Sequence, residues 1–291
     1  MAGWTLGILG GSGLYAIDGL QNQQWVSIDT PWGAPSDDIL FADYGDVRLR
    51  FLPRHGRGHA LSPTSVNYRA NIDALKRAGC TDVLSISAVG SLKEAYAPGH
   101  FVAVDQFIDR TFAREKSFFG PGCVAHVSVA DPVCDRLSGL AADAAEHAGA
   151  TVHRGGTYIA IEGPQFSTRA ESALYRQWGC DVIGMTNMPE AKLAREAELP
   201  YATLAMVTDY DCWHPDHGSV DVASVIAILQ QNAATAGAAV RTLCERLSGT
   251  NRTPCPSGIE TNLDVAIITG PDARDPDLIA KLDAVAGRVL R

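Results

Sequence analysis

The chain has 291 residues, of which 46% are hydrophobic and 20% are charged, a composition typical of a globular protein with a sizeable core. Its formal net charge of −9 argues against a nucleic-acid partner, because binding to a phosphate backbone needs a basic surface. No apolar run approaches the roughly 20 residues of a membrane helix, and the start of the chain lacks the basic region of a signal peptide, so we expect a cytoplasmic protein with no membrane partner. Seven cysteines without a C-x-x-C pair predict reduced, packed thiols.

The first predicted strand, Thr5–Gly10, runs into the glycine-rich stretch Gly10-Gly11-Ser12-Gly13. Glycines let backbone N–H groups approach a ligand closely, so this loop is suited to an anion. The pattern Gly11-x-Gly13-x-x-Ala16 also meets the loose dinucleotide fingerprint, although Asp18-Gly19 interrupts the helix that the fingerprint requires. A dinucleotide-dependent oxidoreductase therefore stays open as an alternative at this point.

Residues 25–52 read as short strands and turns, and the alternating Arg48–Leu52 leads into Arg54 and His55, which lie among glycines. A loop of this composition is dense in donors for an oxyanion, although a solvated basic loop is equally ordinary. The next predicted elements are a helix over Ser65–Ala78 and a buried strand over Val83–Val89, which places Ser87 near a strand end.

The middle of the chain begins with an expected irregular region, residues 101–131, followed by a helix over Asp131–Ala148. A strand over Tyr158–Ile161 then delivers Glu162, which suits either a substrate ligand or a buried partner of backbone amides. Ser167, with Glu171 four residues on, predicts the start of a helix that continues to Trp178. A short strand, Val182–Gly184, precedes a helix opened by Pro189.

The strand Tyr201–Val207 ends in two carboxylates one residue apart, Asp209 and Asp211. In an extended segment these side chains point the same way, so we expect two acids in one patch at the carboxyl end of a buried strand. A turn or a helix cap is the plainer interpretation of the two residues. A long amphipathic helix over Val220–Leu247, a polar connector and a closing helix from about Pro276 complete the chain.

Strands alternating with helices predict an α/β fold with a central mixed sheet covered on both faces. No internal repeat or low-complexity segment divides the chain. We therefore expect one domain over residues 1–249, with residues 250–291 forming a C-terminal extension that contains a helix and packs on the same domain.

If the strand ends converge, their hydroxyls, amides and arginine describe a phosphate site beside two carboxyl groups. Phosphate would then act as a nucleophile while a carboxyl manages a proton on the leaving group, a division of labour that fits a nucleoside. A 6-aminopurine offers donors at position 6 and an acceptor at N7, and a carboxyl pair with one raised pKa matches both. A 6-oxopurine would favour an amide such as Asn, so the two Asp indicate an adenine-type base.

Several segments, in order along residues 5–247, resemble the 5′-methylthioadenosine phosphorylase branch of the trimeric purine nucleoside phosphorylases. They are Gly10-Gly11-Ser12-Gly13-Leu14, Pro53-Arg54-His55-Gly56, Val66-Asn67-Tyr68-Arg69-Ala70-Asn71, Ala88-Val89-Gly90-Ser91-Leu92, the run from Glu162 to Glu171, Gly184-Met185-Thr186 with Pro189-Glu190, and Thr208-Asp209-Tyr210-Asp211-Cys212-Trp213.

The resemblance implies a single-domain phosphorylase-type fold and phosphorolysis of 5′-deoxy-5′-methylthioadenosine to adenine and 5-methylthioribose 1-phosphate. It implies a homotrimer, no metal and no cofactor, with inorganic phosphate as co-substrate. It places phosphate contacts at Ser12, Arg54, His55, Ser87, Ala88 and Thr186, sugar and base contacts at Met185 and Phe166, and the catalytic pair Asp209 and Asp211 on the purine. It also ties Ser167 and Val220 to substrate choice, and His126 to the 5′ pocket of a neighbouring subunit.

Some positions depart from the common pattern of that family. Ser12 and Ser87 stand where threonine is common, which keeps the hydroxyl, and Gln165 replaces a frequent arginine. The loop before Val220 is shorter, so the 5′ substituent is the least defined part of the substrate. A broader phosphorylase acting on adenosine, inosine or methylthioinosine, and a nucleoside-binding regulator on the same fold, remain as alternatives.

Overall fold

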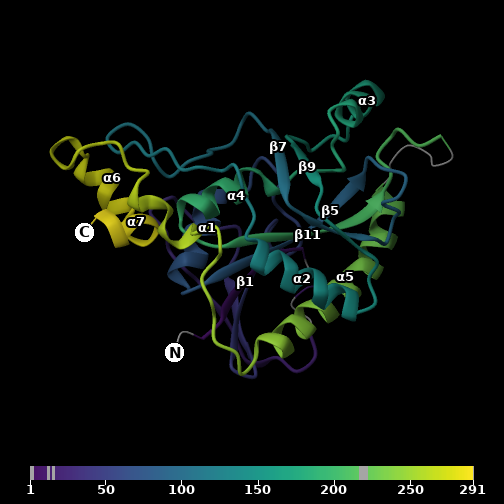
Figure 1. The fold of residues 1–291 in the computed structure, drawn as a ribbon, viewed down its shortest axis with the longest axis horizontal. Helices are drawn as coiled ribbons and strands as arrows, with labels where there is room; N and C mark the ends of the chain where they lie inside the picture. Colours follow the sequence, from purple (N-terminus) through teal and green to yellow (C-terminus); the bar gives the residue numbers. More distant parts are fainter. Residues whose placement is uncertain (1–2, 12–13, 15–16, 216–221, 291) are drawn as a thin grey trace.

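The computed structural model describes residues 3–11, 14, 17–215 and 222–290. Within these residues a single sheet of eleven strands runs through the molecule (Figure 1). The strands are β1 (Thr5–Gly10), β2 (Gln21–Val26), β3 (Ile39–Tyr44), β4 (Val47–Pro53), β5 (Asp82–Ser91), β6 (Phe101–Val104), β7 (Gln106–Arg110), β8 (Val152–Arg154), β9 (Thr157–Ile161), β10 (Val182–Gly184) and β11 (Tyr201–Asp209).

The sheet is mixed, with the order β2-β3-β4-β1-β5-β10-β9-β7, while β11 pairs with β5 and β6, and β8 pairs with β6. Its centre is parallel: β1 pairs in parallel with β4 and β5, and β11 pairs in parallel with β5. The register places Gly10 of β1 opposite Pro53 of β4. The carboxyl ends of these strands therefore meet at one edge, where ligands bind in open α/β sheets.

Helices cover both faces of the sheet, as Figure 1 shows for α2 and α5 on one side and for α1 and α4 on the other. They are α1 (Tyr68–Arg77), α2 (Asp135–His147), α3 (Arg169–Gln177), α4 (Asn187–Glu196), α5 (Val222–Leu247), α6 (Pro276–Lys281) and α7 (Asp283–Leu290), together with the 3₁₀ turns η1 (Ile259–Asp264) and η2 (Pro271–Ala273). No helix within the described residues is long and apolar enough to cross a membrane.

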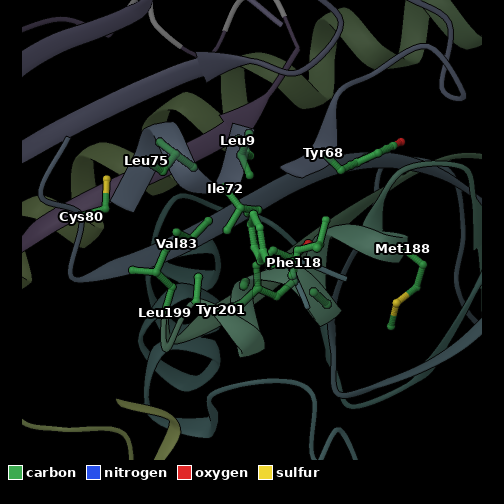
Figure 2. Close-up of a cluster of buried hydrophobic side chains, with 14 of the residues drawn as sticks. Leu9, Tyr68, Ile72, Leu75, Cys80, Val83, Phe118, Met188, Leu199 and Tyr201 are labelled. Atoms are coloured by element: carbon green, nitrogen blue, oxygen red, sulfur yellow. The ribbon is translucent and has the colours of Figure 1, made fainter. Parts of the chain in front are cut away.

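Two hydrophobic cores lie on the two faces, because side chains alternate along each strand. In β1, Leu9 joins the core beneath α1 and α4, whereas Leu6 and Ile8 join the core beneath α2 and α5. Figure 2 shows the first core, where Leu9, Val83 and Tyr201 from three neighbouring strands gather with Ile72 of α1. The predicted α/β fold with a mixed sheet flanked by helices is confirmed.

Residues 250–290 run beside the first core rather than forming a separate globule. The 3₁₀ turn η1 contacts α4, and α7 contacts α1. Leu263 and Val285 are buried in that core. Figure 1 shows α6 and α7 at the end of the molecule away from α3.

The prediction of an irregular region over residues 101–131 is wrong for its first ten residues. They form β6, which pairs antiparallel with β11, and β7, which pairs parallel with β9. The sequence also gave no sign of β8. All three strands are short, with three to five residues each, and segments of that length carry little periodicity.

Helix α3 begins one residue later than the sequence pattern indicated. Its N-cap is Thr168, whose hydroxyl accepts from the Glu171 N–H while the Glu171 carboxylate accepts from the Thr168 N–H. This capping box leaves Ser167 outside the helix. Ser167 therefore faces a cavity instead of capping α3.

Candidate active site

A cavity of about 590 Å³ opens at the edge where the parallel strands end. Residues far apart in the sequence line it, including ten of the predicted site residues: Arg54, His55, Ser87, Ala88, Phe166, Ser167, Met185, Thr186, Asp209 and Asp211. Ser12 and Val220 lie outside the described residues, although Gly11 next to Ser12 lines the same cavity. A space of this size suits a small molecule such as a nucleoside together with an anion.

Arg54 directly follows β4 and is only 2% exposed. Its Nε donates to Glu190 Oε2 at 2.8 Å and its Nη2 to Glu190 Oε1 at 3.1 Å, a bidentate pair that fixes the guanidinium plane. Burial opposes the charged form, but the Glu190 carboxylate outweighs it and raises the pKa of Arg54 above its ordinary value. Among the described residues Nη1 donates only to the Ile86 carbonyl, at 3.1 Å, so one of its two N–H groups remains for a ligand.

His55 lies beside Arg54 with its ring stacked on His59, the ring centroids being 4.3 Å apart. Burial, and then the Arg54 charge, lower the pKa of His55 to about 4, so the imidazole is neutral at pH 7. Its Nδ1 lies 2.9 Å from the Leu61 carbonyl, which only accepts, so Nδ1 carries the hydrogen and Nε2 is an acceptor. The sequence suggested a donor to an anion, whereas this tautomer accepts from a protonated oxygen.

Two hydroxyls face each other deeper in the cavity. Ser87 Oγ, from β5, lies 3.1 Å from the Oγ1 of Thr186, which is the N-cap of α4, and both residues are almost fully buried. Ala88 lines the cavity beside Ser87. With the free N–H of Arg54, these groups form a cluster of donors without lysine, which is the chemistry of an oxyanion site.

Asp209 and Asp211 line the same cavity as that cluster. Strand β11 extends to Asp209, but Asp211 has a φ of 51° and lies in a turn, so an extended backbone is not what brings the carboxyls together. Asp209 Oδ1 accepts from the Asp211 N–H at 2.8 Å, and Oδ2 accepts from the Thr208 hydroxyl at 2.7 Å. A carboxylate has about four acceptor sites, so Asp209 retains capacity for a ligand.

Burial raises the pKa of both Asp209 and Asp211 above the ordinary aspartate value. Hydrogen bonds oppose the rise in both residues, and the nearby Asp209 charge adds to it for Asp211. A pair of this kind can hold one proton while it presents one acceptor, and its titration belongs to the pair. Asp211 therefore lies in a turn and also lines the cavity, so the turn interpretation is confirmed and the functional role stays a prediction.

The remaining walls come from two loops. Phe166 is 48% exposed at the mouth of the cavity, and Met185 lies against Gly163, where any side chain would meet the Met185 sulfur at 2.4 Å. Ser167 Oγ is buried and has no hydrogen-bond partner among the described residues. A buried hydroxyl that lacks a partner and lies on a cavity wall is suited to a polar ligand.

Arg114 forms hydrogen bonds to both loops, the one after β9 and the one after β10, and no sequence pattern indicated this role. Its Nη1 donates to the Met185 and Met188 carbonyls at 2.6 and 2.7 Å, and its Nη2 to the Glu162 carbonyl at 2.7 Å. The Glu162 carboxylate accepts from Arg114 Nε at 3.2 Å and from the Phe112 amide at 2.6 Å. Glu162 is thus a buried partner of backbone amides and of Arg114, as the second of its two sequence-based interpretations expected.

His126 does not line the cavity of its own chain. Its side chain is exposed, and its backbone N–H donates to the Ala266 carbonyl at 2.9 Å, which joins the long loop to the C-terminal extension. In the described part of the chain, β1 is followed by β2 with no helix between them, whereas a dinucleotide-binding unit has a helix after its first strand. Within the described residues no group of three or more His, Cys, Asp or Glu side chains is arranged to hold a metal ion.

Comparison with known proteins shows similarity to phosphorylases over nearly the whole chain. The model of the phosphorylase superfamily matches residues 5–245. An S-methyl-5′-thioadenosine phosphorylase of Cereibacter sphaeroides is 64% identical over 286 residues, covering 98% of each chain. One from Rhodospirillum rubrum is 60% identical over 291 residues, covering 98% of this chain and 97% of its own.

Solved structures agree with the sequence relatives. A methylthioadenosine phosphorylase from an antarctic soil metagenomic library has a TM-score of 0.91 at 45% identity, covering 98% of this chain and 99% of its own. The enzyme of Schistosoma mansoni, solved in complex with adenine, has a TM-score of 0.81 at 34% identity, covering 94% of this chain and 99% of its own. The chain therefore belongs to the phosphorylase superfamily, among the S-methyl-5′-thioadenosine phosphorylases.

Proposed function

We propose that the protein cleaves the N-glycosidic bond of 5′-deoxy-5′-methylthioadenosine with inorganic phosphate, giving adenine and 5-methylthioribose 1-phosphate. The observation that carries this proposal is the presence, in one cavity, of a lysine-free donor cluster and a buried carboxyl pair. The relatives named above act on methylthioadenosine by their names, which supports the same substrate here.

Phosphate would bind to the N–H of Arg54 and the hydroxyls of Ser87 and Thr186, with Ala88 beside them. We also assign Ser12, which lies outside the described residues, to phosphate. His55 Nε2 would accept the O–H of a monoprotonated phosphate, because the ring is neutral and Nδ1 holds its hydrogen. The Glu190 carboxylate neutralises the Arg54 charge, so the pair has no net charge with which to attract phosphate. The directions of the hydrogen-bond donors would therefore contribute more to phosphate binding than net charge.

In the reaction a phosphate oxygen forms a bond to C1′ of the ribose while the bond from C1′ to N9 of the purine breaks. Positive charge develops on the sugar ring and negative charge on the purine. One carboxyl of the Asp209 and Asp211 pair, whose protonated form is favoured because burial raises its pKa, would give a proton or hydrogen bond to N7, and the other would accept from the 6-amino group. The atoms balance without a cofactor or metal, so we propose that phosphate is the only co-substrate.

The sugar and its 5′ group would lie against Met185 and Phe166, and the base edge would reach Ser167, whose buried hydroxyl lacks a partner among the described residues. We assign substrate choice to Ser167 and to Val220. The seven free cysteines are consistent with a reducing compartment, and we propose a cytoplasmic enzyme with no nucleic-acid partner.

The test is phosphate-dependent release of adenine from methylthioadenosine, followed by chromatography of the base and phosphorus NMR of the sugar phosphate. We expect kcat/KM for inosine to be at least about 10²-fold below that for methylthioadenosine, because an oxo group offers no donor to a carboxylate. Adenosine and methylthioinosine measured alongside separate the effects of the 5′ group and the base. Equal use of inosine would overturn the adenine-type assignment, and no phosphate-dependent release would overturn phosphorolysis itself.

We also propose a homotrimer in which His126 enters the 5′ pocket of a neighbouring subunit, with residues 250–291 as an extension of the domain formed by residues 1–249. Support comes from the exposure of His126 and from the large apolar side chains Phe112 and Val265, which are 81% and 94% exposed. We expect the subunit interface to cover these side chains, which would remove apolar area from water.

Light scattering gives the mass of the assembly, and subunit mixing tests His126. Asp209→Asn and His126→Ala proteins, each of low activity alone, should gain activity when their subunits are exchanged. In a mixed trimer some sites combine an intact Asp209 with an intact His126 from the neighbour. A gain would not occur if His126 served its own subunit or the protein were a monomer.

A further inference from the structure

Tyr158, on β9, lies directly behind the two hydroxyls assigned to phosphate. The residue is 0% exposed. Its hydroxyl lies 3.3 Å from Ser87 Oγ and accepts from the Thr186 N–H at 3.5 Å. Ser87 lies on β5 and Thr186 is the N-cap of α4, so one side chain contacts both segments that carry the hydroxyl pair.

The space for this hydroxyl exists because residue 184 is glycine. A Cβ at Gly184 would lie 2.0 Å from the Tyr158 hydroxyl oxygen and 2.6 Å from the ring carbon that bears it. The ring also packs against Phe107, with centroids 5.7 Å apart. Tyr158 is therefore held in one position, with its hydroxyl behind Ser87 and Thr186, which line the cavity.

The direction of the hydrogen bonds follows from what an anion requires. Two hydroxyls that bind one anion must both point their hydrogens at it, so Ser87 and Thr186 cannot donate to each other. The Tyr158 oxygen accepts from the Thr186 amide, which leaves its hydrogen free to donate to Ser87 Oγ. Ser87 Oγ then accepts from the Tyr158 hydroxyl, and the Ser87 hydrogen can be donated to phosphate. Without phosphate the same hydrogen can be donated to the Ala88 carbonyl 3.3 Å away.

We propose that Tyr158 is a positioning residue that orients the Ser87 hydroxyl as a donor to phosphate; this rests on the proposed function. It does not touch the nucleoside, so its removal should act on phosphate alone. Loss of one hydrogen bond of this kind corresponds to a change of about threefold to tenfold.

The experiment compares Tyr158→Phe with the parent enzyme. Phenylalanine keeps the ring and its contact with Phe107 and removes only the hydroxyl. We expect KM for phosphate to rise about threefold to tenfold while KM for the nucleoside changes by less than about twofold. Tyr44→Phe is the matched control, because the Tyr44 hydroxyl donates to Glu245 at the surface, away from the cavity. It should leave both KM values unchanged.

A double-mutant cycle with Ser87→Ala makes the inference specific. Once the Ser87 hydroxyl is absent, Tyr158→Phe should raise the phosphate KM no further. Full additivity of the two changes, or an equal rise of both KM values in Tyr158→Phe, would overturn the inference. So would a phosphate KM within about twofold of the parent in Tyr158→Phe, since that is less than the loss of one hydrogen bond.

The shift of the melting temperature by phosphate alone separates this inference from the proposed function. A parent enzyme that shows the shift but no turnover would contradict phosphorolysis, while the shift in Tyr158→Phe would still report on phosphate binding. Should Tyr158→Phe fail to fold, Gly184→Ala gives the same measurement, because it displaces the Tyr158 hydroxyl.

Discussion

Gly90 on β5 controls the position of the Asp209 carboxylate. A Cβ at residue 90 would lie 2.8 Å from Asp209 Oδ1 and 3.1 Å from a methyl group of Ile183, whereas ordinary van der Waals contact begins at 3.4 Å. Asp209 Oδ1 is held by the Asp211 N–H, and Oδ2 by the Thr208 hydroxyl, so the carboxylate cannot retreat without losing a hydrogen bond. Gly90→Ala therefore moves the proposed proton donor by roughly half an ångström or more.

The expected cost is catalytic as well as structural. A misplacement of about 1 Å at a reacting group costs about 10²-fold, so we expect Gly90→Ala to lower kcat/KM for methylthioadenosine by about 10- to 100-fold. Overpacking of the same contact should also lower the free energy of unfolding by about 1–3 kcal/mol. Steady-state kinetics at saturating phosphate give the first quantity, and urea unfolding gives the second.

Gly139→Ala is the matched control, because it makes the same substitution in α2 at a position where a Cβ meets nothing within 4 Å. It should leave kcat/KM unchanged and stabilise the helix slightly, since alanine is the better helix former. If Gly90→Ala keeps kcat/KM within about threefold of the parent, then the contact that we assign to Asp209 does not set catalysis.

Three further predictions concern Asp209, Arg114 and Glu196. Asp209→Asn should lower turnover of methylthioadenosine by about 10²-fold. It should also reduce the enzyme's preference for methylthioadenosine over inosine, because an amide donates to an oxo group. Nearly unchanged turnover in the kinetic assay would mean that Asp209 has only a structural role. Arg114→Met should lower the free energy of unfolding by about 3–5 kcal/mol in urea titrations, since it leaves buried carbonyls without a donor and the Glu162 charge without its ion-pair partner. Arg154→Met removes an exposed ion pair and should lower the free energy of unfolding by no more than about 1 kcal/mol. Equal losses in the two variants would refute a stabilising role for the buried contacts of Arg114. Burial raises the pKa of Glu196 to about 7, so its contribution to stability is present in full below about pH 4.5 and is lost as the pH rises through 7. Glu196→Gln should therefore gain stability over the parent between pH 5 and 8, by up to roughly 3 kcal/mol, and parallel melting curves across that range would contradict it.

Local patterns in the sequence were sufficient for most of the fold. The strand Thr5–Gly10 has the bounds predicted for it, and the helix predicted over Ser65–Ala78 begins at Tyr68, capped by Asn67. Such elements follow from short-range rules, namely apolar periodicity, capping and glycine stops. The strands in residues 101–110 were missed, because each is stabilised by its pairing with β11 or β9 and not by its own length.

The residue types that line the cavity also came from the sequence, since Ser87 and Asp209 lie in the later parts of β5 and β11, and Thr186 follows β10. What each side chain does could not be inferred in the same way. His55 was expected to donate, but the Leu61 carbonyl and the Arg54 charge make it a neutral acceptor. Asp211 was expected on an extended strand and lies in a turn with a φ of 51°.

The sequence by itself determined the order of the longer strands and of the helices, the family, and the set of polar residues at the strand ends. Only the tertiary structure showed that Glu190 fixes Arg54, that Arg114 joins two loops and that Tyr158 lies behind Ser87. Arg54 and Glu190 are 136 positions apart in the sequence. Arg114 and Met185 are 71 positions apart, and so are Ser87 and Tyr158. The physical reason is that hydrogen-bond direction and pKa depend on partners brought together by folding, and a local sequence pattern carries no information about them.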